Sequence, residues 1–302
     1  LLPVFKESGM TSHDVVFRLR KILGIKKLGH MGTLDPLAEG LLLLGLGTAA
    51  KLNPYLSQLD KSYVAEILIG QTTDTDDCDG EVLEELQPSK DCFKHTYAEK
   101  NLASFIGKQM QVPPDYSAVK SSGQKAYKLS RKGEKPKLQP KEIEVYMAKL
   151  IDIYKDSGSG LPVWKVAFTG SKGTYVRSLA RDIGKKIGCG AHIKSLLRDS
   201  VGPISLECAN GLNEIREAPD TAEFVRSRFI DPIALIDACR FDLDQELYSK
   251  VENGIKISVD SNEERLALCY NDELKAIYEK EEAGHYRARV VFYRGICCGQ
   301  GK

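Results

Sequence analysis

The chain has 302 residues, of which 43 are basic and 42 acidic, so its formal net charge at pH 7 is +1. This balance excludes a protein that binds nucleic acid through its overall charge, although a local basic segment could still do so. Hydrophobic residues make up 42% of the chain, which is enough for buried cores, and the length is typical of about two domains.

Other features of the whole chain narrow its class. No apolar run approaches the roughly 20 residues that a membrane span needs. The first residues, LLPVFKESGM, do not have the pattern of a signal peptide. The eight cysteines form no Cys-x-x-Cys pair, and no cysteine–histidine cluster has zinc spacing. We therefore expect a cytoplasmic protein with reduced thiols, without a metal and without a membrane partner.

The first predicted helix follows a turn at Ser8 and Gly9. Thr11 and Asp14 have the spacing of a capping box, and apolar residues then recur at helical intervals as far as Leu23. We expect Asp14 to cap this helix and to have no chemical role.

Residues 28–48, LGHMGTLDPLAEGLLLLGLGT, are the most distinctive stretch. Glycines on both sides of His30 predict a tight loop whose backbone passes close to another group. Asp35 precedes Pro36 and an apolar run at 41–44, and an aspartate followed by proline is a common helix start. The dipeptide alone therefore favours a capping role for Asp35 at the beginning of a helix.

A strand is predicted within residues 61–77, KSYVAEILIGQTTDTDD. Apolar residues occupy most of both faces of its first half, which is typical of a central strand. Tyr63 lies early in this strand, and by itself it would be one more aromatic residue on a buried strand.

The acidic stretch at 74–82 raises the question of a metal site. It fails the spacing of an EF-hand loop, because Cys78 and Asp79 stand where that loop needs Asp or Asn and then Gly. A hairpin with its turn at Asp79 and Gly80 fits the pattern better.

A basic segment runs from Lys120 to Lys141, after a short helix predicted at 98–107. It contains seven lysines and Arg131 against one acid, Glu134, which is +7 in 22 residues, with tyrosine and glycine interleaved. Charge alone fits a solvated loop equally well, but such a local excess inside a neutral chain favours binding to RNA phosphates.

Strands are predicted at 143–154 and 162–169, followed by a helix that Thr174 could cap and that Gly188 ends. Arg177 lies in the first turn of this helix, where the helix dipole disfavours a cation. Pairing with a carboxylate explains that position better than chance does.

The last part of the chain changes character. Residues 205–232 have a mixed, helical pattern. Residues 233–302 contain three short strand-like pieces, at 265–270, 274–280 and 285–294, and predict a small β domain.

The string GHMGTLDPLAEG strongly resembles the catalytic motif of the TruB family of tRNA pseudouridine synthases, in which the aspartate is the nucleophile. Three further blocks resemble that family in the same order: KESGMTSHDVV, VPPDYSAVK, and GTYVRSLA followed by CGAH. Glu7 departs from the family pattern, which usually has proline after Lys6. The resemblance covers roughly residues 5–205.

The resemblance implies roles for particular residues. Asp35 would be the nucleophile, Arg177 would hold its carboxylate ionised, and Tyr63 would stack on the uracil and take part in proton transfer. The residues expected to bind RNA are His30, Lys61, Tyr175 and Lys120, together with Lys125 and Arg131 of the basic segment. His13 and His192 lie in matched stretches as well, and we expect structural roles for both. No cofactor or metal is implied, since the isomerisation involves neither redox change nor hydrolysis.

The expected fold is the α+β (mixed α/β) pseudouridine synthase core. It would consist of a catalytic domain at 1–232, with a basic thumb-like insertion at about 111–142, and a small C-terminal PUA-like RNA-binding β domain at 233–302. The expected function is that of a stand-alone, monomeric enzyme that flips out uridine 55 in the T stem-loop of tRNA and converts it to pseudouridine.

Two other functions stay open at this point. One is a non-catalytic RNA-binding or tRNA-folding module on the same scaffold. The other is a guide-RNA-dependent pseudouridine synthase that works inside a ribonucleoprotein. Asp35, Tyr63 and Arg177 argue against a pure binding module, and the long insertion without an extended basic tail favours the stand-alone enzyme.

Overall fold

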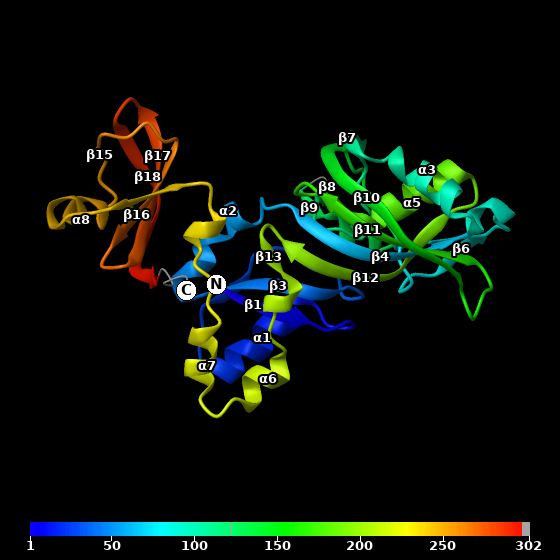
Figure 1. Ribbon diagram of the computed structural model, residues 1–302, viewed down its shortest axis with the longest axis horizontal. Helices are drawn as coiled ribbons and strands as arrows, with labels where there is room; N and C mark the ends of the chain where they lie inside the picture. Colours follow the sequence, from blue (N-terminus) through cyan, green and yellow to red (C-terminus); the bar gives the residue numbers. More distant parts are fainter. Residues whose placement is uncertain (122, 298–302) are drawn as a thin grey trace.

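The computed structural model describes residues 1–121 and 123–297 and contains two main sheets (Figure 1). The larger is a nine-stranded mixed sheet with the order β1-β3-β12-β4-β11-β10-β7, to which β2 adds on β3 and β13 on β12. The smaller has five strands in the order β14-β16-β17-β18-β15 and forms a C-terminal β domain. This is the α+β fold that the sequence predicts.

The strands of the larger sheet are β1 Leu2–Lys6, β2 Leu28–His30, β3 Glu39–Leu46, β4 Lys61–Ile69, β7 Gly107–Gln111, β10 Lys141–Lys155, β11 Pro162–Gly170, β12 Ala191–Val201 and β13 Ile204–Ser205. Two small hairpins are β5 Gln71–Thr73 with β6 Val82–Glu85, and β8 Lys120–Ser121 with β9 Gln124–Lys125. The C-terminal strands are β14 Cys239–Asp242, β15 Ile257–Ser258, β16 Arg265–Tyr270, β17 Glu273–Glu282 and β18 His285–Cys297.

The α-helices are α1 Ser12–Leu23, α2 Asn53–Leu56, α3 His95–Ala103, α4 Ala126–Ser130, α5 Val176–Ile187, α6 Leu212–Glu217, α7 Thr221–Ser227 and α8 Gln245–Val251. Short 3-10 helices span Gly47–Leu52, Lys90–Phe93, Leu206–Cys208 and Ile233–Leu235. Within the described ranges, no helix is long and apolar enough to cross a membrane.

Strand β4 lies in the centre of the larger sheet, as its apolar pattern predicts. It pairs antiparallel with β11 on one side and with β12 on the other. The core beside it contains Trp164, Phe168 and Ile183, all at most 1% exposed, and α3 and α5 pack there. The strand predicted as far as residue 77 ends earlier, because Gly70 adopts a φ of +107° and the chain turns into the short hairpin strand β5.

The prediction of a helix after Asp35 is wrong. The apolar run at 41–44 lies in strand β3, where all four leucines are buried. Leu42 and Leu44 point into a core shared with α1, while Leu41 and Leu43 point into a second core on the other face. Burial on both faces stabilises a strand of leucines although leucine by itself favours helix.

The helix boundaries confirm one capping prediction and correct another. Thr11 and Asp14 form the expected capping box at the start of α1. Thr174 does not cap α5: the N-cap is Tyr175, and the Thr174 hydroxyl is buried without a partner among the described residues. No side chain caps α5. The Gln111 side chain instead holds the backbone of the N-cap residue, accepting from the Tyr175 N–H at 2.9 Å and donating to the Tyr175 carbonyl at 3.1 Å.

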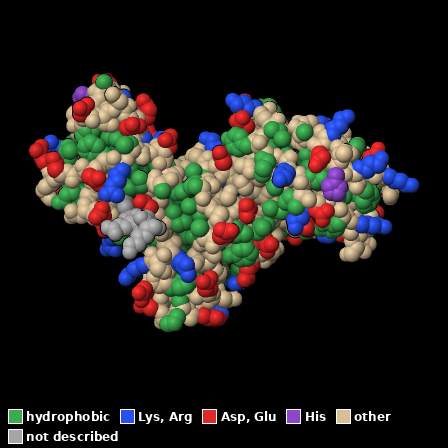
Figure 2. Space-filling model, viewed as in Figure 1, with side chains coloured by type: hydrophobic (Ala, Val, Ile, Leu, Met, Phe, Trp, Pro, Cys, Tyr) green, Lys and Arg blue, Asp and Glu red, His purple; other side chains and the backbone are tan. Residues whose placement is uncertain are grey.

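The three strand-like pieces predicted near the C-terminus are confirmed as β16, β17 and β18, whereas β14, α8 and β15 were not predicted. The C-terminal sheet shares a core with the larger sheet, since Ile277 and Phe292 cluster with Leu41 and Leu52. Figure 1 shows it at one end of an elongated molecule, and Figure 2 shows a hollow between it and the rest. Acidic and basic side chains are interspersed on that face, which agrees with the near-neutral net charge.

Candidate active site

A cleft of about 840 Å³ opens over the middle of the larger sheet, between the loop that precedes β3, the start of β4, the start of α5 and the basic insertion. Eight of the nine residues proposed from the sequence line it: Asp35, Tyr63, Arg177, His30, Lys61, Tyr175, Lys125 and Arg131. The ninth, Lys120, is exposed on β8 and is not part of the cleft lining, so its contact with RNA stays a prediction.

Asp35 and Arg177 form an ion pair in the cleft, with 2.8 Å between Oδ2 and Nη2. The arginine side chain is 5% exposed and the aspartate side chain 33%, so the carboxylate faces the cleft while the guanidinium lies beneath it. The cation in the first turn of α5 therefore has the carboxylate partner that its unfavourable position implies.

The Arg177 guanidinium has further partners. It forms a second ion pair with Asp77, at 3.3 Å, and donates to the carbonyls of Thr75 and Tyr116, at 3.0 Å each. One cation thus joins the Asp35 loop to the acidic loop and to the start of the basic insertion. Its Nε is buried and has no partner among the described residues.

Buried polar groups hold the loop that carries Asp35. The Lys6 ammonium donates to the carbonyls of Met10 at 2.7 Å, Glu7 at 3.0 Å and Pro36 at 3.2 Å. Burial, partly offset by the nearby Asp35 carboxylate, lowers the pKa of Lys6 to about 8. Because Glu7 contributes its backbone carbonyl and its side chain is exposed, its substitution for the usual proline leaves this contact in place.

Arg198 holds the same loop from β12. This buried side chain donates to the carbonyls of Leu41 at 2.7 Å, Thr33 at 3.2 Å and Gly32 at 3.4 Å. Gly40 adopts a φ of +111°, and a Cβ there would lie 2.3 Å from the Arg198 carbonyl oxygen, so only glycine fits. The close backbone approach predicted around His30 is not found there, since a Cβ at Gly29 or Gly32 would meet no atom nearer than 3.7 Å; it occurs further along the same stretch, at Gly40.

Tyr63 and Lys61 begin β4 beside this arginine. Tyr63 is the register partner of Arg198, and burial raises the pKa of its phenol above the usual value, although Arg198 opposes the shift. The Lys61 ammonium donates to the carbonyls of Ser57 and Leu59. Burial, and then the charge of Arg198, lowers the pKa of Lys61 to about 8.

Two histidines face the cleft from different segments. His30 ends β2, and its Nδ1 is buried without a partner among the described residues. Burial is the main reason why the pKa of His30 is lowered, and the nearby charge of His13 lowers it further. His13 was expected to be structural, but it lines the cleft with its ring 6.0 Å from that of His30. His192, by contrast, is buried and bonds the Gln71 carbonyl at 3.0 Å, as a structural residue would.

The basic insertion covers the cleft with cationic and aromatic side chains. It occupies the connection between β7 and β10, whose ends pair at Gln111 and Lys141. Lys125 and Arg131 lie 5.9 Å and 5.5 Å from the ring centre of Tyr127, and all three line the cleft. The cleft therefore has a carboxylate at its floor and a cationic, aromatic rim, which suits a polyanion that must present a base to the floor.

Sequence reasoning missed Asp77, Arg198 and Lys6 as parts of the site. The acidic stretch had been weighed only as a metal loop or a turn, yet Asp76 pairs with Arg181 at 2.9 Å and Asp77 with Arg177. An arginine that directly follows Leu196 and Leu197 within β12 was the available signal for Arg198. The described part of the chain contains no group of three His, Cys, Asp or Glu residues that could hold a metal.

The mixed sheet, the aspartate–arginine pair and the basic, tyrosine-bearing rim form a cleft with the charge and the aromatic surface to bind RNA and to hold one base beside a carboxylate. Solved structures share the fold. In a Cbf5–Nop10–Gar1 complex, a chain 23% identical superposes with a TM-score of 0.68, over 96% of this chain and 83% of that one. In an H/ACA RNP bound to a substrate RNA containing 2′-deoxyuridine, a chain 21% identical superposes with a TM-score of 0.66, over 96% of this chain and 84% of that one.

Sequence comparison identifies the family. Residues 20–176 match the N-terminal domain of TruB family pseudouridylate synthase, and residues 177–233 match the tRNA pseudouridylate synthase B C-terminal domain. The tRNA pseudouridine synthase B of Streptococcus sanguinis is 38% identical, over 95% of this chain and 97% of that protein. The tRNA pseudouridine synthase B of Ligilactobacillus salivarius is 36% identical, over 96% of this chain and 98% of that protein. The chain belongs to the TruB family of pseudouridine synthases, which confirms the resemblance of its motifs.

Proposed function

We propose that this protein isomerises uridine 55 in the T-loop of tRNA to pseudouridine, with Asp35 as its nucleophile. The observation that carries the proposal is the Asp35–Arg177 ion pair of 2.8 Å at the floor of the cleft. The relatives that match nearly the whole chain are tRNA pseudouridine synthases B, which supports tRNA as the substrate.

The chemistry needs a nucleophile that forms a bond and later leaves. The Asp35 carboxylate would add to the uridine at C6 or at C1′, and the glycosidic N1–C1′ bond would break. After the base rotates, C5 bonds to C1′, the carboxylate leaves, C5 loses its proton and N1 gains one. Arg177 orients the carboxylate and stabilises its negative charge throughout.

Tyr63 and Tyr175 would hold the flipped base. Burial raises the pKa of both phenols, so both are neutral at pH 7 and present uncharged aromatic rings to the uracil. Tyr63 lies next to Arg198 on the sheet and lines the cleft. As a neutral phenol it would take part in the final step by relaying the C5 proton to solvent, its oxygen accepting that proton while its O–H gives up another.

The remaining proposed residues would bind the RNA backbone and its displaced neighbours. Lys61, Lys125 and Arg131 provide positive charge around the cleft, and Lys120 extends it outward on β8. His30, with an unpartnered buried Nδ1, would support the nucleotides from which uridine has been extruded. Unpairing and unstacking that uridine costs about a few kcal/mol, which the binding energy of these contacts must offset.

We also propose the wider organisation that the sequence suggested. Residues 1–232 would be the catalytic domain, with its insertion at about 111–142, and residues 233–302 a PUA-like RNA-binding domain. The five-stranded sheet, whose strands all fall between residues 239 and 297, supports a separate β unit there. The enzyme would work as a monomer in the cytoplasm, where tRNA is transcribed and modified.

The first experiment measures tritium release from an unmodified tRNA transcript that carries 5-tritiated uridine. Wild type should release the tritium of one uridine, mapping to position 55, because only C5 of the isomerised base exchanges its hydrogen. Asp35→Asn should bind the same tRNA and release none. Asp14→Asn, the same chemical change at the capping box of α1, should retain activity.

Other outcomes would separate the alternatives. Tight binding with no release by wild type would contradict the stand-alone enzyme and favour a binding module or a guide-dependent enzyme. Equal release by wild type and Asp35→Asn would show that Asp35 is not the nucleophile.

A further inference from the structure

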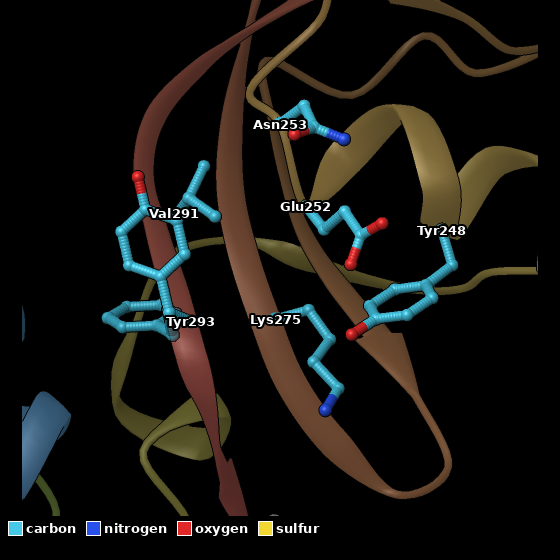
Figure 3. A pocket seen from close by; sticks show the side chains of 7 residues that line it. Tyr248, Glu252, Asn253, Lys275, Val291 and Tyr293 are labelled. Atoms are coloured by element: carbon cyan, nitrogen blue, oxygen red, sulfur yellow. The ribbon is translucent and has the colours of Figure 1, made fainter.

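The C-terminal β domain contains a second pocket, of about 270 Å³, between α8, β17 and β18 (Figure 3). The proposed reaction does not use it. We propose that this pocket binds one unpaired nucleotide of an RNA strand, with its base stacked against Tyr293. The inference rests on the proposed function only for the identity of that RNA as the enzyme's own substrate.

Tyr293 is unusual because its side chain lies in solvent. It is 83% exposed on β18, whereas the preceding residue, Phe292, is 1% exposed in the core. The Lys51 ammonium lies 5.4 Å from the centre of the Tyr293 ring and is held there by donating to the Val291 carbonyl at 3.1 Å. An exposed ring with a fixed cation beside it adds little to folding, but it offers a stacking surface next to a charge that attracts phosphate.

Tyr248 forms the opposite side of the pocket. Its ring stacks on Tyr270, with ring centres 4.3 Å apart and planes inclined by 4°, so its orientation is fixed. The Lys275 ammonium lies 5.5 Å from the Tyr248 ring and pairs with Glu273 at 2.5 Å. Figure 3 shows Tyr248 and Tyr293 on opposite sides of the pocket, with Lys275 extending between them.

The size and the polar edge of the pocket argue for a base. Its volume lies just below the range of about 300–1,000 Å³ typical of pockets that enclose drug-sized ligands, which leaves room for one planar ring system and not for a helix. Asn253 donates its Nδ2 to the Ser249 carbonyl, so its Oδ1 is left as an acceptor. Glu252 also lines the pocket, and its carboxylate adds a second acceptor.

These two acceptors distinguish the pocket from a site for a free anion. A carboxylate repels phosphate, but it accepts hydrogen bonds from the N–H groups on the edge of a nucleobase. The aromatic surfaces therefore match the face of one unstacked nucleobase, and the acceptors match its edge. The lysines match the phosphate backbone of the same nucleotide.

The test uses the full chain and a fluorescein-labelled single-stranded RNA hexamer that cannot pair with itself, with binding measured by fluorescence anisotropy. Tyr293→Ala should weaken binding by roughly 10-fold, the effect of losing one base–aromatic stack. Tyr293→Phe should bind as wild type does, because the ring remains. Tyr146→Ala is the matched control, since Tyr146 is an exposed tyrosine, 46% exposed, outside both pockets, and should change nothing.

The inference is overturned if wild type does not bind the hexamer, or if wild type and Tyr293→Ala bind it equally, which would place all binding in the catalytic cleft. A loss in Tyr146→Ala as large as that in Tyr293→Ala would also overturn it. The readout is separate from catalysis: a wild type that binds through Tyr293 but releases no tritium from tRNA would contradict the proposed function and leave this inference standing.

Discussion

Arg177 donates to two carboxylates and two backbone carbonyls that come from three separate segments of the chain. Asp35 faces the cleft, and Asp77, with its side chain 7% exposed, lies behind. A guanidinium held on two sides keeps its position when a substrate approaches Asp35. At the residue scale, Asp77 therefore sets the orientation of the Arg177–Asp35 ion pair.

We predict that Asp77→Asn lowers the single-turnover rate of pseudouridine formation by about 10- to 100-fold, with a smaller effect on tRNA affinity. The reason is that Arg177 loses one of its charged partners and can shift relative to Asp35, and a tenfold rate loss corresponds to about 1.4 kcal/mol of barrier. Glu81→Gln, which alters an exposed carboxylate of the same acidic stretch outside the cleft lining, is the control and should retain the wild-type rate. Equal rates for Asp77→Asn and wild type would contradict the positioning role.

Lys61 predicts a pH dependence of RNA binding. Its pKa of about 8 in the free protein means that it is charged below pH 8 and neutral above it. Affinity for tRNA should therefore fall by a few-fold as pH rises from 7 to 9, because one phosphate contact loses its charge. Lys61→Arg, which stays charged, should bind with little change over this range, and Lys61→Met should bind weakly at every pH. A fall of the same size in Lys61→Arg would assign the effect to another group.

At the element scale, α5 is defined as much by close packing as by its helical sequence. Gly184 lies inside this helix, and a Cβ there would approach the backbone nitrogen of Ala191, at the start of β12, to 2.1 Å. Helix propensity favours alanine over glycine by about 1 kcal/mol, so local and tertiary effects oppose each other here. The contact is with backbone, which cannot move aside cheaply.

We predict that Gly184→Ala destabilises the protein by about 2 kcal/mol, despite its better helix propensity, because the added methyl group overpacks the contact between α5 and β12. Urea unfolding measures the change, and Lys185→Ala on the exposed side of the same helix should stay within about 0.5 kcal/mol of wild type. A Gly184→Ala variant as stable as wild type would mean that α5 can shift, and Arg177 with it.

Strand β3 shows how far the sequence predicts a single element. The helical capping box, the central strand β4 and three of the five strands of the C-terminal sheet, β16 to β18, follow from local patterns and are confirmed. The four leucines of β3 were assigned to a helix because a continuous apolar run has no period of its own. Only the presence of a core on each face makes that run a strand.

At the scale of the whole molecule, the two sheets share one core. Phe292 and Ile277 of the C-terminal sheet pack with Leu41 and Leu52 of the larger part. Thr48 also donates to the Arg294 carbonyl at 2.9 Å across the same boundary. A shared core of this kind makes the unfolding of the two parts cooperative.

We predict that Phe292→Ala lowers the unfolding midpoint of the entire chain, by an amount that corresponds to about 3 kcal/mol or more for removing a buried aromatic side chain. Trp164 is the only tryptophan and lies in the larger sheet, so its fluorescence reports on that part alone. Its transition should move together with the far-UV circular dichroism. Tyr293→Ala, an exposed neighbour on β18, should leave the midpoint unchanged. A Trp164 transition that does not move would indicate two independent units.

By itself, the sequence determined the family, the α+β class, the cleft residues that carry distinctive motifs, and the pairing of Arg177 with a carboxylate. These follow from information contained in short segments: a motif, a helix turn, an alternating strand. The tertiary structure decided the rest. Asp77, Arg198 and Lys6 belong to the site because separate segments meet around one loop, and their partners lie far away in sequence. Hydrogen bonds and burial between such segments depend on how the sheet is assembled, which no local pattern encodes.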